Sequence, residues 1–358
     1  MLRFLETVLI TVVFGLLFTW LRVPLSWMLG PLAGVLLWTG FTRRQLSFPL
    51  WLRNVGLVLL GYAMGLAFTA DSARQIVTQL PWMLLATVLT VGFSLLMAGL
   101  LTRFTGIDAA SSAIGSIPGG LSQMVVLAEE VQGADQTVVA FLQTIRLLTV
   151  IFVVPFLAVH SLSNGPGADL STSSPASASS ASSIFGEPYT WVLLAGFVLA
   201  AALLSVRLKL PTPWFLGPLA AAALLTVSGY PPPHLPSPMI LAAQWCLGVY
   251  LGLGIKLTSL AGWRRLLPLS VISGLFIVGF SLALSFWFSS MHPMSVATAF
   301  LGTSPGGMTE MGVTATTVHA DVSLVVAYQM FRILFILFVV PYGLRWAFRA
   351  RSTRPENR

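Results

Sequence analysis

The sequence contains very little charge and a single cysteine. Charged residues make up 8% of its 358 residues, hydrophobic residues make up 56%, and the mean hydropathy is +0.88. Soluble domains carry about 25% charged residues, so this chain lacks the polar side chains that would cover a water-facing surface. Cys246 has no partner for an internal disulfide and lies in an apolar run, which favours a small buried side chain. A soluble fold and a disulfide-stabilised fold are both excluded.

Motifs for the common catalytic and metal chemistries are missing as well. The four histidines are scattered, and no cluster of His or Cys has the spacing of metal ligands. The sequence has no Walker A motif, dinucleotide fingerprint or nucleophile elbow. The net charge of +8 is not accompanied by a soluble basic domain or a recognition helix. We therefore expect no enzyme activity, cofactor or bound metal, and no direct contact with nucleic acid.

What the sequence does contain is a series of apolar runs of about 17–22 residues, long enough to cross a bilayer as helices. Strands of alternating polarity, which would indicate an outer-membrane barrel, do not occur. The first run, Leu5 to Trp20, is not followed by a small-residue cleavage site, so we expect a retained helix and not a signal peptide. The sequence predicts an all-α polytopic membrane protein whose partner is the lipid bilayer.

The chain is an internal duplication with a shift of 187 residues, which becomes 186 after one deletion. The matched blocks are Leu21–Ala33 with Leu208–Ala220, Gly61 and Gly65 with Gly248 and Gly252, Gly115–Met124 with Gly302–Met311, and Ala134–Pro155 with Ala320–Pro341. Between the copies lies a segment rich in Ser, Ala, Gly and Pro, which is typical of a flexible linker. We predict a first membrane repeat over 1–160, a linker over 161–188, a second repeat over 189–347 and a basic tail over 348–358.

Each repeat is predicted to contain five helices and one segment interrupted by a Pro-Gly-Gly motif. The first-repeat helices are expected near 4–21, 24–41, 52–70, 80–102 and 136–159, with the interrupted segment at 108–130. The second-repeat helices are expected near 189–206, 213–229, 239–256, 266–289 and 322–346, with the interrupted segment at 294–318. The matched glycines and the segments Trp27–Pro31 and Trp214–Pro218 favour close packing between helices.

The basic residues decide between two topologies, because cytoplasmic loops collect Lys and Arg. If the interrupted segment enters and leaves on one side, each repeat has five crossings and the second repeat is inverted. With a cytoplasmic N-terminus, that count places 15 of the 19 basic residues inside and 2 outside. Six crossings place 10 inside and 7 outside. We therefore predict inverted repeats in a bacterial inner membrane, with both termini cytoplasmic and the linker periplasmic.

The two interrupted segments are the predicted functional site. Proline removes a backbone donor and paired glycines loosen a helix, so the backbone at membrane depth must be buried in protein or line a wet cavity. Broken segments at matching positions of two halves point to a transporter binding site, although a structural kink remains an alternative. The candidate substrate-binding residues are Ser116, Pro118, Gly119, Gly120, Ser122, Gln123, Gln143 and Arg146 in the first repeat, and Thr303, Ser304, Pro305, Gly306, Gly307, Thr309, Gln329 and Arg332 in the second.

Three kinds of charged residue accompany the motifs. Glu310, which matches Gln123 in the first repeat, is a candidate for coupling to an ion, or else a carboxylate wetted at the hairpin end. Arg146 and Arg332 each follow a glutamine by three residues, which places both side chains on one helix face. Each arginine could pair with Glu310, bind the carbonyls of a broken helix or hold an anionic substrate. The aspartates that open the last helices, Asp135 and Asp321, are interpreted as N-caps.

The doubled Pro-Gly-Gly blocks, each followed by a Gln-x-x-Arg helix, resemble the duplicated AbrB-type membrane proteins of Gram-negative bacteria. The similarity covers nearly the whole chain outside the linker, and the family pattern singles out Pro118, Gly119, Gly120, Pro305, Gly306 and Gly307. The resemblance implies a membrane regulator of gene expression, and some members are labelled ammonia monooxygenases, although this chain lacks a copper or iron ligand set. The family's kinship with cation/proton antiporters and bile-acid-type symporters implies inverted repeats and broken helices.

Two functions follow as hypotheses. The first is a secondary transporter for a small, anionic solute coupled to protons or sodium, and the second is a membrane sensor that affects gene expression indirectly. A membrane enzyme is a distant third. The sequence identifies neither the solute nor the coupling ion, and it does not decide between a monomer and a homodimer.

Overall fold

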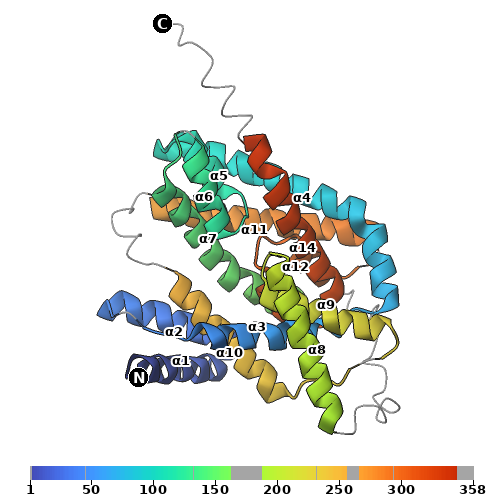
Figure 1. Ribbon diagram of the computed structural model, residues 1–358. Helices are drawn as coiled ribbons and strands as arrows, with labels where there is room; N and C mark the ends of the chain where they lie inside the picture. The colour runs from blue at the N-terminus through green and yellow to red at the C-terminus, as the bar shows by residue number, and fades with distance from the viewer. Residues whose placement is uncertain are drawn as a thin grey trace, which may run out of the picture. The chain divides into compact units, whose positions relative to one another are not determined.

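A computed structural model describes residues 2–44, 46–131, 133–162, 188–230, 232–255, 266–292 and 294–344. All regular structure in these residues is helical, which confirms the predicted all-α fold (Figure 1). Most of the predicted linker and the whole basic tail lie outside the described residues.

All ten uninterrupted helices that the sequence predicts are present. The first repeat forms α1 (Leu2–Trp20), α2 (Ser26–Thr42), α3 (Leu50–Gly65), α4 (Ala70–Thr105) and α7 (Gln136–Leu157), which a short π-helix (Ala158–Leu162) follows. The second forms α8 (Pro188–Arg207), α9 (Pro213–Val227), α10 (Ser237–Gly254), α11 (Leu266–Met291) and α14 (Val322–Phe338). The largest difference from the predicted boundaries is at α4, which begins at Ala70, ten residues early, and continues through Pro81. The ends of α3 and α14, at Gly65 and Phe338, come five and eight residues earlier than predicted.

Each interrupted segment forms two short helices. In the first repeat these are α5 (Ala109–Ser116) and α6 (Leu121–Glu130), and in the second they are α12 (Val296–Thr303) and α13 (Met308–Thr317). The prolines and glycines of both motifs lie in the gaps between the paired helices.

The chain has the helices of a polytopic membrane protein. Six described helices are long and apolar enough to cross a bilayer, and three shorter apolar helices accompany them. Large apolar side chains are also exposed: Leu193 on α8 is 67% exposed and Phe276 on α11 is 59% exposed. Apolar surface of this extent is stable in lipid and unfavourable in water.

The described residues pack into two compact units, and each unit takes helices from both repeats. Unit 1 comprises Met1–Thr78, Pro155–Leu257 and Thr309–Val326. Unit 2 comprises Gln79–Val154, Thr258–Met308 and Ala327–Arg358. The repeats are therefore not separate packing units, because each contributes helices to both.

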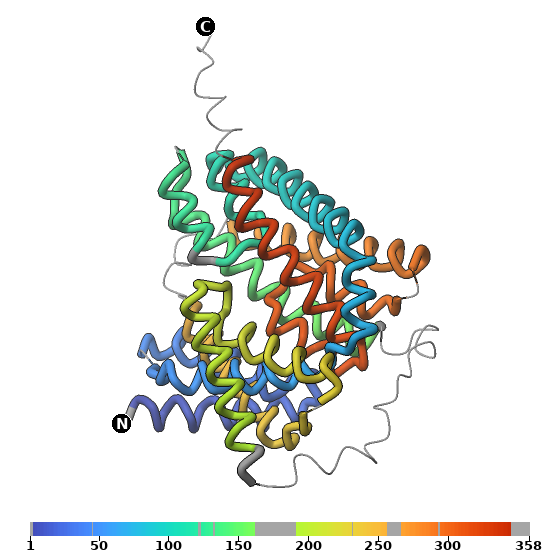
Figure 2. The backbone as a smooth tube through the Cα atoms, turned by 45° about the vertical axis from the view of Figure 1, so that its right-hand side comes forward, coloured from blue at the N-terminus to red at the C-terminus, as the bar shows by residue number. Residues whose placement is uncertain are grey.

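Unit 1 is held together by close helix contacts that the two repeats exchange (Figure 2). A Cβ on Gly61 of α3 would lie 2.3 Å from the carbonyl oxygen of Phe215 on α9, and a Cβ on Gly248 of α10 would lie 2.2 Å from the carbonyl oxygen of Met28 on α2. Gly61 matches Gly248, and Met28 matches Phe215, in the register of the duplication. Such an exchange of contacts is the mark of a twofold relation. The predicted packing role of these glycines is confirmed.

A second pair of contacts in unit 1 obeys the same register. A Cβ on Gly30 of α2 would lie 2.6 Å from the carbonyl oxygen of Phe14 on α1, and a Cβ on Gly217 of α9 would lie 2.5 Å from that of Ala201 on α8. The first two helices of each repeat therefore cross in direct backbone contact, which a larger side chain at either glycine would prevent.

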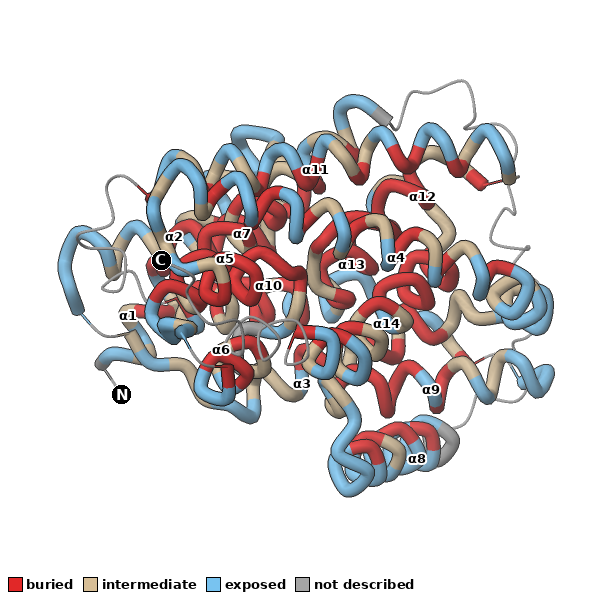
Figure 3. Tube along the Cα trace, turned by 90° about the horizontal axis from the view of Figure 1, so that it is seen from above, coloured by how far each residue is buried: buried red, intermediate tan, exposed pale blue. Residues whose placement is uncertain are grey.

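Unit 2 contains α4 from Gln79, α5, α6, α7, α11, α12 and α14 from Ala327. One apolar cluster joins the first interrupted segment to α7 and α14 through Ile114, Met124, Val139 and Ile336. A second cluster joins α7 to the start of α11. The first of these clusters packs the first interrupted segment against long helices. Both α5 and α12 are buried along most of their length (Figure 3).

Candidate functional site

The backbone at both breaks has the same turn, centred on proline. In the first segment the Gly119 N–H donates to the Ile117 carbonyl at 2.8 Å, and in the second the Gly306 N–H donates to the Ser304 carbonyl at 2.8 Å. A bond from residue i+2 back to residue i defines a γ-turn, whose central φ proline already favours. The motif therefore ends one short helix sharply and leaves carbonyls of its last turn unpaired within the backbone.

The first interrupted segment folds back on itself as a hairpin. The Asp108 carboxylate accepts the N–H of Ala110 at 2.9 Å and so caps the start of α5. Beyond the end of α6, the Asp135 N–H donates to the Ser111 hydroxyl at 2.7 Å, and a Cβ on Gly133 would lie 3.5 Å from the Asp108 carboxylate. The end of α6 thus meets the start of α5, and the segment returns to the side from which it enters.

Gln143 and Arg146 on α7 occupy the carbonyls that the first break leaves free. The Gln143 amide donates to the carbonyls of Ile114 and Ile117 at 3.0 and 2.9 Å. The Arg146 guanidinium donates to Ile117 at 2.6 Å and to Ser116 and Gly119 at 3.4 Å each, and it donates to the Gln143 side-chain oxygen at 2.6 Å. The predicted placement of glutamine and arginine on one helix face is confirmed.

Gln329 and Arg332 on α14 repeat this arrangement at the second break. The Gln329 amide donates to the carbonyls of Leu301 and Ser304 at 2.7 and 3.0 Å. The Arg332 guanidinium donates to the Ser304 carbonyl, to the Gly306 carbonyl at 2.6 Å and to the Gln329 side-chain oxygen. Of the two protein partners that the sequence left open for the arginines, Glu310 and the broken-helix carbonyls, the arginines bind the carbonyls.

Both guanidinium groups are buried and lack a counter-charge. Arg146 is 7% exposed and Arg332 is 3% exposed, and neither forms an ion pair with a carboxylate in the described part of the chain. Three buried polar atoms at the breaks have no hydrogen-bond partner among the described residues: Nε of Arg146, Nε of Arg332 and Oγ of Ser304.

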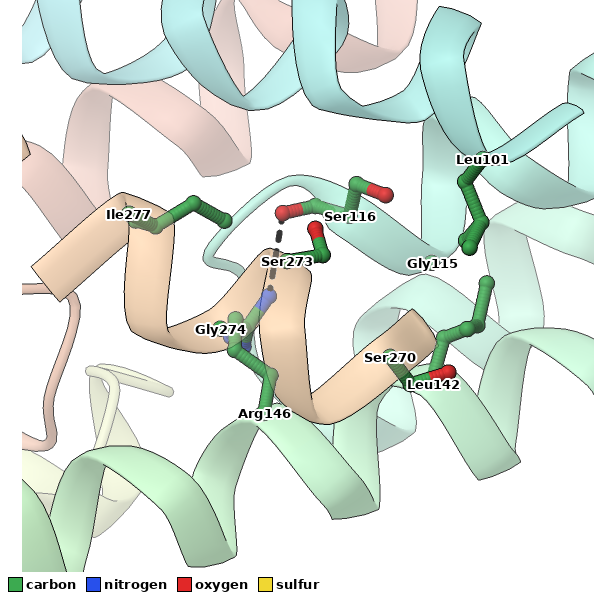
Figure 4. Close-up of a pocket in the computed structure, with 9 residues that line it drawn as sticks. All are labelled: Leu101, Gly115, Ser116, Leu142, Arg146, Ser270, Ser273, Gly274 and Ile277. Atoms are coloured by element: carbon green, nitrogen blue, oxygen red, sulfur yellow. Dashed lines mark hydrogen bonds between the residues drawn. The ribbon is translucent and has the colours of Figure 1, made fainter. Parts of the chain in front are cut away.

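A small cavity adjoins the first break (Figure 4). Its polar wall consists of Ser116 and Arg146 from the first repeat and of Ser270 and Ser273 on α11 from the second. The cavity measures about 10 Å³, which is roughly the room that one water molecule needs. The sequence analysis missed the serines of α11. One signal was available in the sequence. Ser270, Ser273 and Gly274 have helical spacing on one face of α11. Their matches in the first repeat are Met83, Ala86 and Thr87.

Thr309 and Glu310 lie on α13 and belong to unit 1, whereas the other candidate residues belong to unit 2. Glu310 is 4% exposed, so it is not wetted at a surface. Its Oε2 atom has no hydrogen-bond partner among the described residues, and it forms no ion pair there. Of Ser122 only the backbone, in the first turn of α6, is described.

The remaining expectations concern caps and metals. Asp135 accepts the N–H of Thr137 at 2.7 Å, and Asp321 accepts the N–H of Leu324 at 3.1 Å, so both predicted N-caps are confirmed. Gln123, which matches Glu310, lies beside Gly120, where a Cβ would be 3.1 Å from its side-chain oxygen. Among the described residues no group of three or more His, Cys, Asp or Glu side chains could hold a metal ion.

Comparison with known proteins gives one family. Residues 27–348 match the family model described as transition state regulatory protein AbrB. YhjN of Bacillus subtilis (strain 168), whose name assigns no function, is 28% identical over 267 residues, which cover 71% of this chain and 67% of YhjN. AbrB of Escherichia coli (strain K12), named as a candidate regulator, is 27% identical over 325 residues, or 89% of each chain. Neither name states an enzymatic activity, and the Bacillus protein shows that such sequences are not confined to Gram-negative bacteria.

Proposed function

The chain belongs to the AbrB family, and we propose that it is a secondary transporter that moves a small anionic solute across a bacterial cytoplasmic membrane. The observation that supports this proposal best is the pair of buried arginines without a carboxylate partner in the described residues. A buried charge is strongly unfavourable unless an opposite charge or a set of dipoles compensates it. The carbonyl dipoles of the broken helices compensate in part, and a bound anion would complete the compensation.

The free polar groups at the breaks suit an anion. Nε of each arginine and the Ser304 hydroxyl can each donate one hydrogen bond that no described residue accepts. The first turn of α6, which begins after Gly120, presents backbone N–H groups at the positive end of a ten-residue helix. A carboxylate or phosphate group placed there would accept several charge-assisted hydrogen bonds at once. The hydroxyls of Ser116 and Thr303 would complete its contacts.

Glu310 is the proposed coupling residue. Its side chain is buried, one of its oxygens has no partner among the described residues, and the matching residue Gln123 cannot ionise. A carboxyl group at membrane depth typically binds a proton or a cation that moves with, or against, the solute. One titratable group in an otherwise duplicated pattern would give one coupling event per cycle.

The hairpin of the first segment supports the proposed topology. A segment that returns to its starting side leaves five crossings in its repeat, and an odd number of crossings inverts the repeat that follows. This count agrees with the distribution of Lys and Arg, with both termini cytoplasmic and the linker periplasmic. Because the cavity beside the first break holds about one water, solute entry would require α5, α6 or α11 to move.

The name of the Escherichia coli relative favours a second candidate, a membrane sensor that influences gene expression through the solute that it detects. Uptake distinguishes the two functions. Proteoliposomes containing the purified chain would be tested with labelled mono-, di- and tricarboxylates and phosphate esters, under inward or outward proton and sodium gradients. We expect accumulation of at least one anion above protein-free liposomes. Saturable binding of an anion without movement under any gradient would favour the sensor.

A further inference from the structure

Unit 1 contains a cavity of about 220 Å³ that the proposed transport site does not use. Its walls come from α3, α10, α13 and the residues before α10. Most of the lining is aliphatic, and the polar lining residues are His234, Gln244 and Thr316. An engineered apolar cavity of about 150 Å³ is large enough to bind benzene. The cavity in unit 1 therefore has room for a molecule of about ten non-hydrogen atoms.

The duplication explains why the cavity is open. Ala63 and Ile240 line it, and their matches in the other repeat are Tyr250 and Arg53. There the Arg53 guanidinium lies over the Tyr250 ring, 4.2 Å from its centroid. The large side chains of Arg53 and Tyr250 thus fill the matching positions in the other repeat. At the cavity, the smaller side chains of Ala63 and Ile240 leave the space open.

The cavity also contains a buried amide without a partner. Gln244 is 8% exposed, and its side chain forms no hydrogen bond with a described residue. Its match in the first repeat is Leu57, an apolar core residue. A polar side chain that lines a mostly apolar cavity without a protein partner can hydrogen-bond to a polar group of a ligand. Its retention at an apolar position therefore points to a ligand group that the amide contacts.

The rim of the cavity is fixed by a hydrogen bond from α3. The Tyr62 hydroxyl on α3 donates to the Pro233 carbonyl at 2.7 Å, next to the lining residues His234 and Leu235. His234 is exposed, so the rim reaches the surface of the unit. A cavity with a fixed rim loses little conformational entropy when it binds a ligand.

We infer that this cavity binds a neutral, flat, amphipathic molecule of about ten non-hydrogen atoms whose single polar group hydrogen-bonds to Gln244. The lining contains no Asp, Glu, Lys or Arg, so an anionic solute of the kind proposed for the breaks would be disfavoured here. The occupant would contact Val313 and Thr316 on α13, the helix that carries Glu310. The site is therefore distinct from the proposed transport site and adjoins the helix that carries the proposed coupling residue.

Titration calorimetry on the purified full-length chain tests this inference with two probes. Indole has a bicyclic frame and one N–H donor, and indene has nearly the same shape without the donor. We expect saturable binding of indole to the wild type. Gln244→Leu should weaken indole by about tenfold, the equivalent of one lost hydrogen bond to a buried group, and should leave indene within about threefold.

Ala63→Tyr introduces the residue found at the matching position and should abolish binding of both probes by filling the cavity. Ala200→Tyr, on an exposed face of α8, is the matched control and should bind both probes like the wild type. The inference is overturned if the wild type does not bind indole saturably, or if Ala63→Tyr binds indole as tightly as Ala200→Tyr. An equal loss of indole and indene in Gln244→Leu would overturn the role given to the amide.

Discussion

Phe93 and Phe280 occupy the same place in the two repeats and stack on each other, with ring centroids 4.2 Å apart and ring planes 4° from parallel. A residue meets its own match only where a symmetry axis passes between them. Arg146 and Arg332 also match in the register of the duplication. The two repeats of unit 2 are therefore joined around a pseudo-twofold axis, and each supplies one broken helix and one arginine.

The exchanged glycine contacts of unit 1 predict a paired effect on stability. Gly61→Ala and Gly248→Ala would each force a Cβ to within 2.3 and 2.2 Å of a carbonyl oxygen. Each should lower the free energy of unfolding by about 1–3 kcal/mol, as overpacking does. Gly92→Ala and Gly279→Ala are matched controls, because a Cβ at either site meets nothing within 4 Å. The controls should be neutral or stabilising by up to about 1 kcal/mol. Melting curves in detergent would contradict the contacts if all four variants behaved alike.

The contacts of the arginines with the broken-helix carbonyls predict that removing an arginine destabilises the fold. Arg146→Leu removes the donors to the carbonyls of Ser116, Ile117 and Gly119 and should destabilise the fold by about 3 kcal/mol or more. Arg146→Lys keeps the charge but not the planar fork, so a smaller loss is expected. Arg103→Lys, at an exposed position, serves as control. Equal melting temperatures for Arg146→Leu and Arg103→Lys would show that the contacts contribute nothing.

Glu310→Gln separates coupling from solute movement. The substitution keeps the size of the side chain and removes its ability to ionise, and it reproduces the residue of the first repeat, Gln123. We expect exchange of labelled for unlabelled solute across proteoliposomes to continue within about threefold of wild type, while accumulation driven by an ion gradient is lost. Accumulation at the wild-type level in Glu310→Gln would rule out the coupling role.

Cysteine labelling tests the proposed topology in intact cells. Cys246 is buried, so Cys246→Ala gives a background without a competing thiol. In that background Ser173→Cys, in the predicted linker, should react with a membrane-impermeant maleimide from outside. Ser352→Cys, in the predicted tail, should react only after the membrane is opened. Both positions lie outside the described residues, and labelling of Ser352→Cys in intact cells would reverse the proposed orientation.

The helices, both breaks and the pairing of Gln143 with Arg146 could be predicted from the sequence, because each depends on local features. Apolar runs identify spans, proline and glycine interrupt them, and an i, i+3 spacing fixes a shared helix face. The early start of α4 was not predicted: the expected helix began near residue 80, whereas α4 begins at Ala70 and continues through Pro81.

Long-range packing could not be predicted in this way. The sequence shows that Gly61 and Gly248 match, but it does not show that each packs on the other's repeat, since no periodicity encodes a partner far along the chain. The division into two units, each built from both repeats, could not be predicted for the same reason. The cavity lined by Ala63 could not be predicted either, because the sequence does not show that Arg53 and Tyr250 stack on each other at the matching positions.

If an anion completes the charge balance of Arg146 and Arg332, its binding should stabilise the folded chain against heat. Melting temperatures of the purified chain would be recorded with a panel of carboxylates and phosphate esters and with their uncharged amide or ester analogues. A ligand present at 100 times its dissociation constant stabilises a protein by about 2.7 kcal/mol. We predict that at least one anion raises the melting temperature in a saturable way while its neutral analogue does not. If no anion stabilises the chain, or if the neutral analogues stabilise it equally, the anion site is contradicted.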